Sequence, residues 1–139
     1  MRQILLITLG LSTALFASFS KNGNIVTDSI TGLHWQDDAV GSAMIWTRAI
    51  DYCENLTLDT YSDWRLPNLK ELTSIMNDTK VSPSIDTSVF QYTVSDIYWS
   101  STTYSGNSSY AWLVRFVDGY QSYYDKTYKS YVRCVRAGQ

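Results

Sequence analysis

Few side chains in this 139-residue chain have the types and spacing that catalysis requires. His34 is the only histidine, and no serine or acid stands at a motif spacing from it, so a packing or hydrogen-bonding role is expected. Carboxylate pairs for glycoside hydrolysis are assembled by the fold, so the sequence leaves such a pair open without favouring one. The sequence therefore predicts a protein that is not an enzyme.

The two cysteines, Cys53 and Cys134, lie 81 positions apart. In an exported chain with a single pair, one disulfide between an early element and the last one is the simplest interpretation. Closing so long a loop stabilises the fold by roughly 4 kcal/mol in the chain-entropy model. Two free thiols or a catalytic cysteine are the alternatives. Both are disfavoured because neither cysteine has a CxxC partner and His34 is distant in sequence.

Oxygen ligands for a cation are scattered. Asp78, Asp86 and Asp96 lie in or beside an irregular segment, and carboxylates are ligands that calcium prefers. Dispersed loop aspartates are usually only solvated. The sequence predicts no metal or cofactor, and it leaves calcium open.

The last third of the chain favours binding chemistry, because it is rich in tyrosine, amides and cations. Sugars stack their C–H faces on aromatic rings, while amides and charges bind hydroxyls or sulfates. One face of a strand must fill the core, and the alternating residues Tyr110, Trp112, Val114 and Phe116 are expected to be that buried set. The remaining candidates for ligand binding are Tyr104, Asn107, Tyr123, Tyr124, Lys126, Tyr128 and Lys129.

The charge is unevenly distributed along the chain. The net charge is −2, but residues 21–109 carry five basic and eleven acidic side chains, whereas residues 110–139 carry five basic and two acidic ones. Overall acidity disfavours nucleic acid as a partner. The basic C-terminal part leaves a local anion-binding face open.

The N-terminus has the layout of a secretory signal peptide. One positive charge in residues 1–3 precedes the apolar run Ile4–Ala17, and the small residues Ala17, Ser18 and Ser20 follow. The run is short for a membrane span. We predict a signal peptide over residues 1–20, cleaved after Ala17 or after Ser20, and an exported domain over 21–139 with no membrane span, in the periplasm, at the cell surface or secreted. An uncleaved anchor or a buried helix is the alternative.

The first half of the domain is expected to hold a hairpin and two helices. Asn24–Asp28 and Leu33–Gln36 suit two strands around a turn at Gly32. Ser42 is the expected N-cap of the first helix, whose apolar stripe is Trp46, Ala49, Ile50, Cys53 and Leu56.

The second helix is expected to follow Pro67, which keeps Leu66 extended. Asn68 and Glu71 suit a capping box. Its inward stripe is Leu69, Leu72, Ile75 and Met76, and its end is expected near Asn77 and Asp78.

The second half is expected to hold a long surface loop and then a sheet. Residues 80–96 show no clean period, which predicts a loop. Strands are expected at Ile97–Thr102, Tyr110–Val117, Tyr120–Tyr124 after a turn at Asp118 and Gly119, and Tyr131–Val135, which would close the sheet. Two helices followed by an antiparallel sheet define an α+β fold with long surface loops.

Six blocks in this order resemble one family: Thr31–Gln36, Ala49–Cys53, Tyr61–Leu72, Trp99–Thr102, Ala111–Trp112 with Phe116–Gly119, and Tyr131–Arg136. Together they strongly resemble the DUF1566 family, also called the Lcl C-terminal domain family. The resemblance covers the chain from about Val26 to its end.

The resemblance implies a C-type-lectin-like fold, related to formylglycine-generating-enzyme and sulfatase-modifying domains, with a disulfide from a helix to the last strand. It also implies an adhesin-like binding module at the bacterial envelope or surface, whose partner is a carbohydrate, a sulfated polysaccharide or a protein. The alternatives are an assembly module that binds itself, as a homo-oligomer, or another envelope protein, and an enzyme related to formylglycine-generating enzyme. The collagen-like repeats of the family's adhesin are missing from this sequence, and its net acidity speaks against strong polyanion binding.

Overall fold

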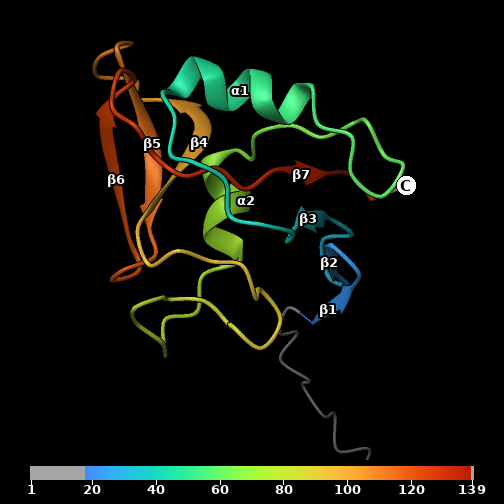
Figure 1. Cartoon of the computed structure of the whole chain (residues 1–139). Coiled ribbons are helices and arrows are strands. Elements are labelled where there is room, and N and C mark those ends of the chain that lie inside the picture. The colour runs from blue at the N-terminus through green and yellow to red at the C-terminus, as the bar shows by residue number, and fades with distance from the viewer. Residues whose placement is uncertain (1–17, 139) are drawn as a thin grey trace, which may run out of the picture.

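The computed structural model describes residues 18–138. It shows an α+β domain with two helices and two antiparallel sheets (Figure 1). Most of the predicted signal peptide lies outside the described residues. Within residues 18–138, no helix has the length and hydrophobicity needed to cross a membrane.

The first sheet has the strand order β1-β2-β3-β7. It contains β1 (Phe19–Asn22), β2 (Ile25–Asp28), β3 (His34–Gln36) and β7 (Val135–Arg136). The predicted hairpin of β2 and β3 is confirmed, and its turn contains Gly32 at a φ of 75°. The sequence analysis missed β1, which spans the predicted boundary between residues 20 and 21 and packs its Phe19 ring 5.1 Å from that of Phe90.

The second sheet has the order β4-β5-β6, formed by β4 (Ile97–Thr103), β5 (Tyr110–Arg115) and β6 (Tyr120–Asp125). These three strands are confirmed, including the hairpin at Gly119, where φ is 83°. The prediction that Tyr131–Val135 closes this sheet is wrong. Only a single bridge from Tyr131 to Tyr98 joins it, because the chain then crosses to β3 of the other sheet, where β7 pairs.

The first helix, α1 (Trp46–Glu54), begins later than predicted. Ser42 is not its N-cap: that position is Ile45, which makes no side-chain capping bond. The physical reason is a two-residue bridge between Met44 and Ser130, whose backbone groups exchange hydrogen bonds of 2.9 and 3.0 Å and keep the chain extended. The buried helix residues Ala49 and Cys53 both belong to the predicted stripe.

The second helix, α2 (Leu69–Ser74), has the predicted capping box. The Asn68 Oδ1 atom accepts from the Glu71 amide at 2.8 Å, and the Glu71 Oε1 atom accepts from the Asn68 amide at 3.0 Å. The helix ends at Ser74, earlier than predicted. Just before it, Trp64 is buried, whereas the Arg65 side chain stays at the surface and donates to both Glu71 oxygens at 2.6 and 2.7 Å.

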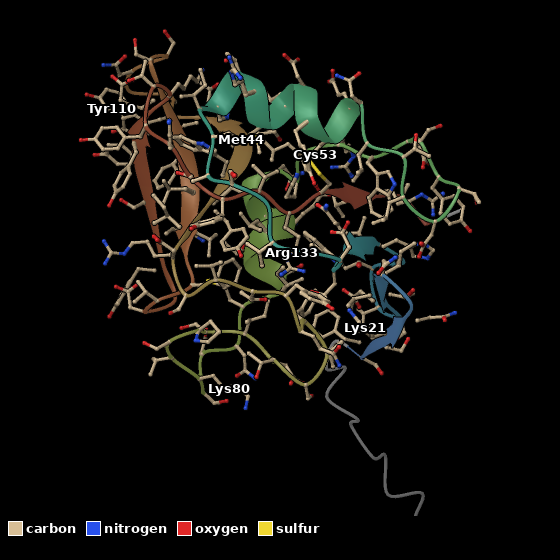
Figure 2. The ribbon with its side chains drawn as sticks, in the orientation of Figure 1. Lys21, Met44, Cys53, Lys80, Tyr110 and Arg133 are labelled. Carbon is tan, nitrogen blue, oxygen red and sulfur yellow. A yellow bond between two sulfur atoms is a disulfide. The ribbon has the colours of Figure 1, made fainter. Side chains whose placement is uncertain are left out.

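The two helices cover opposite faces of the second sheet. Consecutive strand residues point to opposite faces, and Tyr98 packs in a cluster with Leu72 of α2, whereas Trp99 packs in a cluster with Ala49 of α1. The predicted disulfide is confirmed: Cys53 of α1 is bonded to Cys134, with a Cα–Cα distance of 5.5 Å (Figure 2). The disulfide therefore ties α1 to the segment that leads into β7.

The predicted loop over residues 80–96 contains no helix or strand, as expected, but it is anchored in the core. Ile85 and Phe90 are fully buried. The Asp37 carboxylate accepts from the backbone amides of Gln91 and Tyr92 at 2.9 and 3.0 Å. A loop predicted to run over the surface is thus partly an internal element.

Asp37 also binds two cations, Lys21 of β1 and Arg133. Arg133 lies near the middle of the domain (Figure 2), and it donates to the carbonyl oxygens of Gln36 and Tyr92 at 2.6 and 2.8 Å. Burial by itself would raise the pKa of Asp37, but the hydrogen bond from Lys21 and the charge of Arg133 outweigh it and hold that pKa below its usual value. The first sheet, the loop and the segment before β7 meet at this carboxylate.

Candidate binding site

Four aromatic side chains gather on the second sheet and form what we call the aromatic cluster: Tyr104, Tyr110, Trp112 and Tyr123. The rings of Tyr104 and Tyr123 stack with centroids 3.9 Å apart and planes 3° apart. Trp112 meets these two rings edge-on at 5.6 and 5.2 Å, and Tyr110 meets Tyr123 edge-on at 6.2 Å. Edge-on contacts, like offset stacking, are favourable geometries for aromatic rings.

The hairpin register brings the cluster together. The turn at Gly119 sets Trp112 directly opposite Tyr123, so their side chains share one face of the sheet. Tyr104 follows β4, and its amide donates to the Tyr110 carbonyl at 2.9 Å. A Cβ atom at Gly106 would lie 2.6 Å from Cε1 of Tyr104, so a larger residue at this position would require the Tyr104 ring to shift.

A groove of about 420 Å³ adjoins the cluster at the outer end of the sheet, where Figure 2 shows Tyr110. Tyr123 is 43% exposed. A ligand can reach the part of this ring that Tyr104, Trp112 and Tyr110 leave exposed. The groove is lined by Tyr110, Tyr123, Tyr124, Asp125 and Tyr128.

The charge in this groove is negative. Hydrogen bonds from the Thr127 amide and hydroxyl, at 2.9 and 2.7 Å, lower the pKa of Asp125, which keeps it ionised at neutral pH. Lys126 points elsewhere: its Nζ atom lies 4.0 Å from the centroid of the Trp46 ring and donates to Thr103 at 3.0 Å. Aromatic rings beside a carboxylate can bind a polyhydroxylated ligand by stacking and hydrogen bonding.

The prediction that Tyr110 and Trp112 are buried in the core is wrong. The inward residues of this part of β5 are Ala111 and Leu113, and both pack under α1. Val114, on the same face as Trp112, is buried with Leu72 of α2, whereas Trp112 belongs to neither hydrophobic cluster. The short α2 thus covers only part of that face, and the aromatic cluster occupies the rest.

The seven predicted binding residues do not form a single site. Tyr104 and Tyr123 are in the aromatic cluster. Tyr124 and Tyr128 line the groove, with ring centroids 5.5 Å apart. Three lie elsewhere: Asn107 accepts from the Ser109 amide within its own turn, Lys126 packs on Trp46, and Lys129 lines a separate open groove with Arg48 and Asp51.

Sequence reasoning missed Trp112 and Tyr110 as site residues, although a signal for them existed. Counting back from the turn at Gly119 pairs Trp112 with Tyr123 and Tyr110 with Asp125. Because charged residues are rarely buried in a core, a face that ends at Asp125 is not expected to be core along its whole length.

His34 takes part in a second polar group. Its Nδ1 atom lies 2.8 Å from a guanidinium nitrogen of Arg136, which also donates to Asp63 at 2.6 Å and stacks 3.7 Å from the Tyr61 ring. Burial, followed by the positive charge of Arg136, lowers the pKa of His34. This neutral, hydrogen-bonded histidine has the role that the sequence predicts.

Two of the three loop aspartates, Asp86 and Asp96, are engaged locally. Asp86 accepts from the Ser88 amide and hydroxyl at 3.0 and 2.6 Å, and Asp96 accepts from the Ile97 amide at 2.8 Å. Within residues 18–138, no three histidine, cysteine or acidic side chains lie close enough together to hold a metal ion.

The fold and this surface define a class of protein: a disulfide-linked α+β domain with an aromatic cluster on its three-stranded sheet. The chain belongs to the Lcl C-terminal domain family, whose model matches residues 24–136. The match includes both cysteines and every residue of the aromatic cluster, and it confirms the resemblance seen in the sequence. No curated protein matches the chain.

Proposed function

We propose that this chain is an exported, non-catalytic domain that binds a carbohydrate at the bacterial cell envelope or surface through the aromatic cluster. The observation that carries the proposal is the half-exposed ring of Tyr123, which is held against Tyr104. A ring already fixed in position loses little rotational freedom when a sugar stacks on it, so more of the stacking energy appears as affinity.

The disulfide supports the proposed export, because such bonds persist in oxidising compartments outside the cytosol. It joins a helix to the segment before the last strand, which supports the C-type-lectin-like fold implied by the family. An oxidase of the formylglycine-generating type would need reactive thiols. Both cysteines of this chain are committed to the disulfide, which favours binding over catalysis.

The ligand we favour is an uncharged saccharide rather than a sulfated one. Asp125 gives the groove a negative charge that repels sulfate, and of the two candidate lysines Lys126 packs on Trp46 and Lys129 lines another groove. Hydroxyl groups, in contrast, can donate to the Asp125 carboxylate. Added salt should therefore change the affinity little.

The direct test is a glycan-binding screen followed by titration calorimetry on the mature domain. Tyr123→Ala should weaken binding at least about tenfold, which corresponds to ~1.4 kcal/mol. Tyr120→Ala is the matched control, because Tyr120 is on the same strand, is 69% exposed and takes no part in the ring contacts of the cluster. Equal affinity of the two variants, or no binding to any glycan, would refute the proposal.

A second variant tests the cluster without removing a ring. Gly106→Ala should displace Tyr104 and so weaken sugar binding, because the new Cβ would lie 2.6 Å from the ring. Gly41→Ala is its control, since nothing lies within 4 Å of a Cβ atom there. Native affinity in Gly106→Ala would show that the stack with Tyr104 is not needed.

A second candidate function is an assembly module in which the chain binds a copy of itself. The observation that favours it is the outer edge of β6, with which no strand pairs within residues 18–138.

A further inference from the structure

The sheet face that carries the aromatic cluster holds a second open groove, of about 530 Å³, beside α2. Lys70 of α2, Thr102 of β4 and Gln121 of β6 are among the residues that line it. We call it the α2 groove, and we call the groove lined by Tyr110 and Asp125 the outer groove. The two grooves share no lining residue.

Strand β6 connects the two grooves. Alternate residues of a strand point to the same face, so Gln121, Tyr123 and Asp125 form one row. Gln121 lines the α2 groove, Asp125 lines the outer groove, and Tyr123 of the aromatic cluster lies between them in the row. At about 3.4 Å per strand residue the row spans roughly 14 Å, which is longer than a single sugar ring.

The helix α2 forms one wall of this face, against the second sheet (Figure 1). Val114 lies directly opposite Gln121 in the hairpin and is buried with Leu72 of α2. On β4, Thr102 lines the α2 groove and stands two residues before Tyr104, whose ring belongs to the cluster. The α2 groove therefore adjoins the aromatic cluster on the side away from the outer groove.

The α2 groove offers polar groups that the rest of the described chain does not use. Within residues 18–138, the Gln121 side-chain amide and the Lys70 ammonium make no hydrogen bond or ion pair, and both side chains are exposed. An amide both donates and accepts, and an ammonium donates, so both groups can bind sugar hydroxyls. This groove can therefore hold a sugar unit next to the one that stacks on Tyr123.

The charges along this path cancel. Lys70 is the charged residue that lines the α2 groove, and Asp125 is the one that lines the outer groove. One positive and one negative charge leave the path without the net charge that an ionic chain would need. Both grooves are open at the surface, so a chain can continue past either of them.

We propose that this domain binds an uncharged polysaccharide along its length, with successive sugar units in the outer groove, on Tyr123 and in the α2 groove. This inference rests on the proposed carbohydrate function and names the form of the ligand. The ligand is the interior of a chain, and neither a single sugar nor a chain end is sufficient to fill the row from Gln121 to Asp125.

The test is titration calorimetry of the mature protein with neutral oligomers of glucose, mannose, galactose and N-acetylglucosamine, in series of increasing length. The affinity is expected to rise at least about tenfold from the shortest oligomer that binds to one that reaches both grooves. Gln121→Ala and Lys70→Ala should each weaken binding of the long oligomer about fivefold, because each removes a hydrogen-bonding group. Both variants should bind the shortest oligomer as the native protein does, whereas Tyr123→Ala should weaken binding of every length.

Lys80→Ala is the matched control, since it removes the same charge from an exposed lysine that lines neither groove and lies well apart from Tyr110 (Figure 2). Circular dichroism confirms that each variant is folded. An affinity that stays constant with oligomer length would overturn the proposal, and so would a gain with length that both Gln121→Ala and Lys70→Ala leave intact. In either case a loss of binding in Tyr123→Ala would still support the sugar site, whereas no binding of any oligomer would overturn both proposals.

Discussion

The Asp37 side chain joins several parts of the molecule that are distant in sequence. Its carboxylate binds Lys21 of β1, Arg133 and two backbone amides of the loop over residues 80–96. Its side chain is fully buried, and that of Arg133 is nearly so. A buried cation that loses its partner is strongly destabilising, because its charge is then uncompensated.

Asp37→Asn should therefore lower the free energy of unfolding by about 3 kcal/mol at neutral pH, measured by urea denaturation. Asp51→Asn, the same change at an exposed position of α1, should have little effect. Because the folded-state pKa of Asp37 is lowered, its contribution is complete at neutral pH and is lost as the pH falls below about 4. An unfolding free energy in Asp37→Asn equal to that of the native protein would contradict this role.

Sequence reasoning at the residue scale succeeded for local partners and failed for distant ones. Asn68 and Glu71 are three positions apart, and their mutual bonds follow from helix geometry alone. Asp37 and Arg133 are 96 positions apart, and no local pattern marks them as partners. The burial of Trp112 was predicted wrongly for a similar reason. How far α2 extends over β5 depends on tertiary packing, which no local pattern shows.

At the scale of elements, the two helices begin in different ways. α2 has a side-chain cap at Asn68, whereas α1 follows a backbone bridge between Met44 and Ser130 and has none. A serine just ahead of an apolar stripe is a common N-cap signal, yet Ser42 lies before the bridge. The start of α1 is therefore set by the pairing of Met44 with Ser130 and not by a local capping residue.

Asn68→Ala should therefore destabilise the protein by ~1 kcal/mol, as the loss of an N-cap does. Ser42→Ala should leave stability unchanged, because Ser42 is exposed and does not cap the helix. Thermal or urea denaturation of the two variants compares them directly. A similar loss in both would show that α1 depends on Ser42 after all.

For the strands too, pairings between sequence neighbours were predicted, whereas a pairing between distant segments was not. The hairpins β2–β3 and β5–β6 were predicted because short turns with glycine join neighbouring strands. The partner of β7 was not predicted, because β7 pairs with β3, which lies about one hundred positions earlier in the chain. The sequence therefore supports the α+β class and most strands, but not the division into two sheets.

At the scale of the whole molecule, the disulfide is the main covalent constraint. Replacing both cysteines with alanine should lower the free energy of unfolding by about 4 to 5 kcal/mol in the chain-entropy model. The native protein in reductant should match this variant. Intact mass should rise by two hydrogens on reduction, and an unchanged mass, with free thiols already present in the purified protein, would contradict the bond.

The same bond has a mechanical consequence. If the described chain is pulled from its two ends, tension passes from α1 at Cys53 directly to Cys134 and on to β7. The 80 residues between the two cysteines, which include α2 and all of the second sheet, lie off this load path. The first sheet still packs against the second, since Val26 and Trp35 share a hydrophobic cluster with Tyr98 and Val114, so the relief concerns the backbone path alone. The backbone that carries the proposed ligand site therefore bears no direct load when the two ends are pulled.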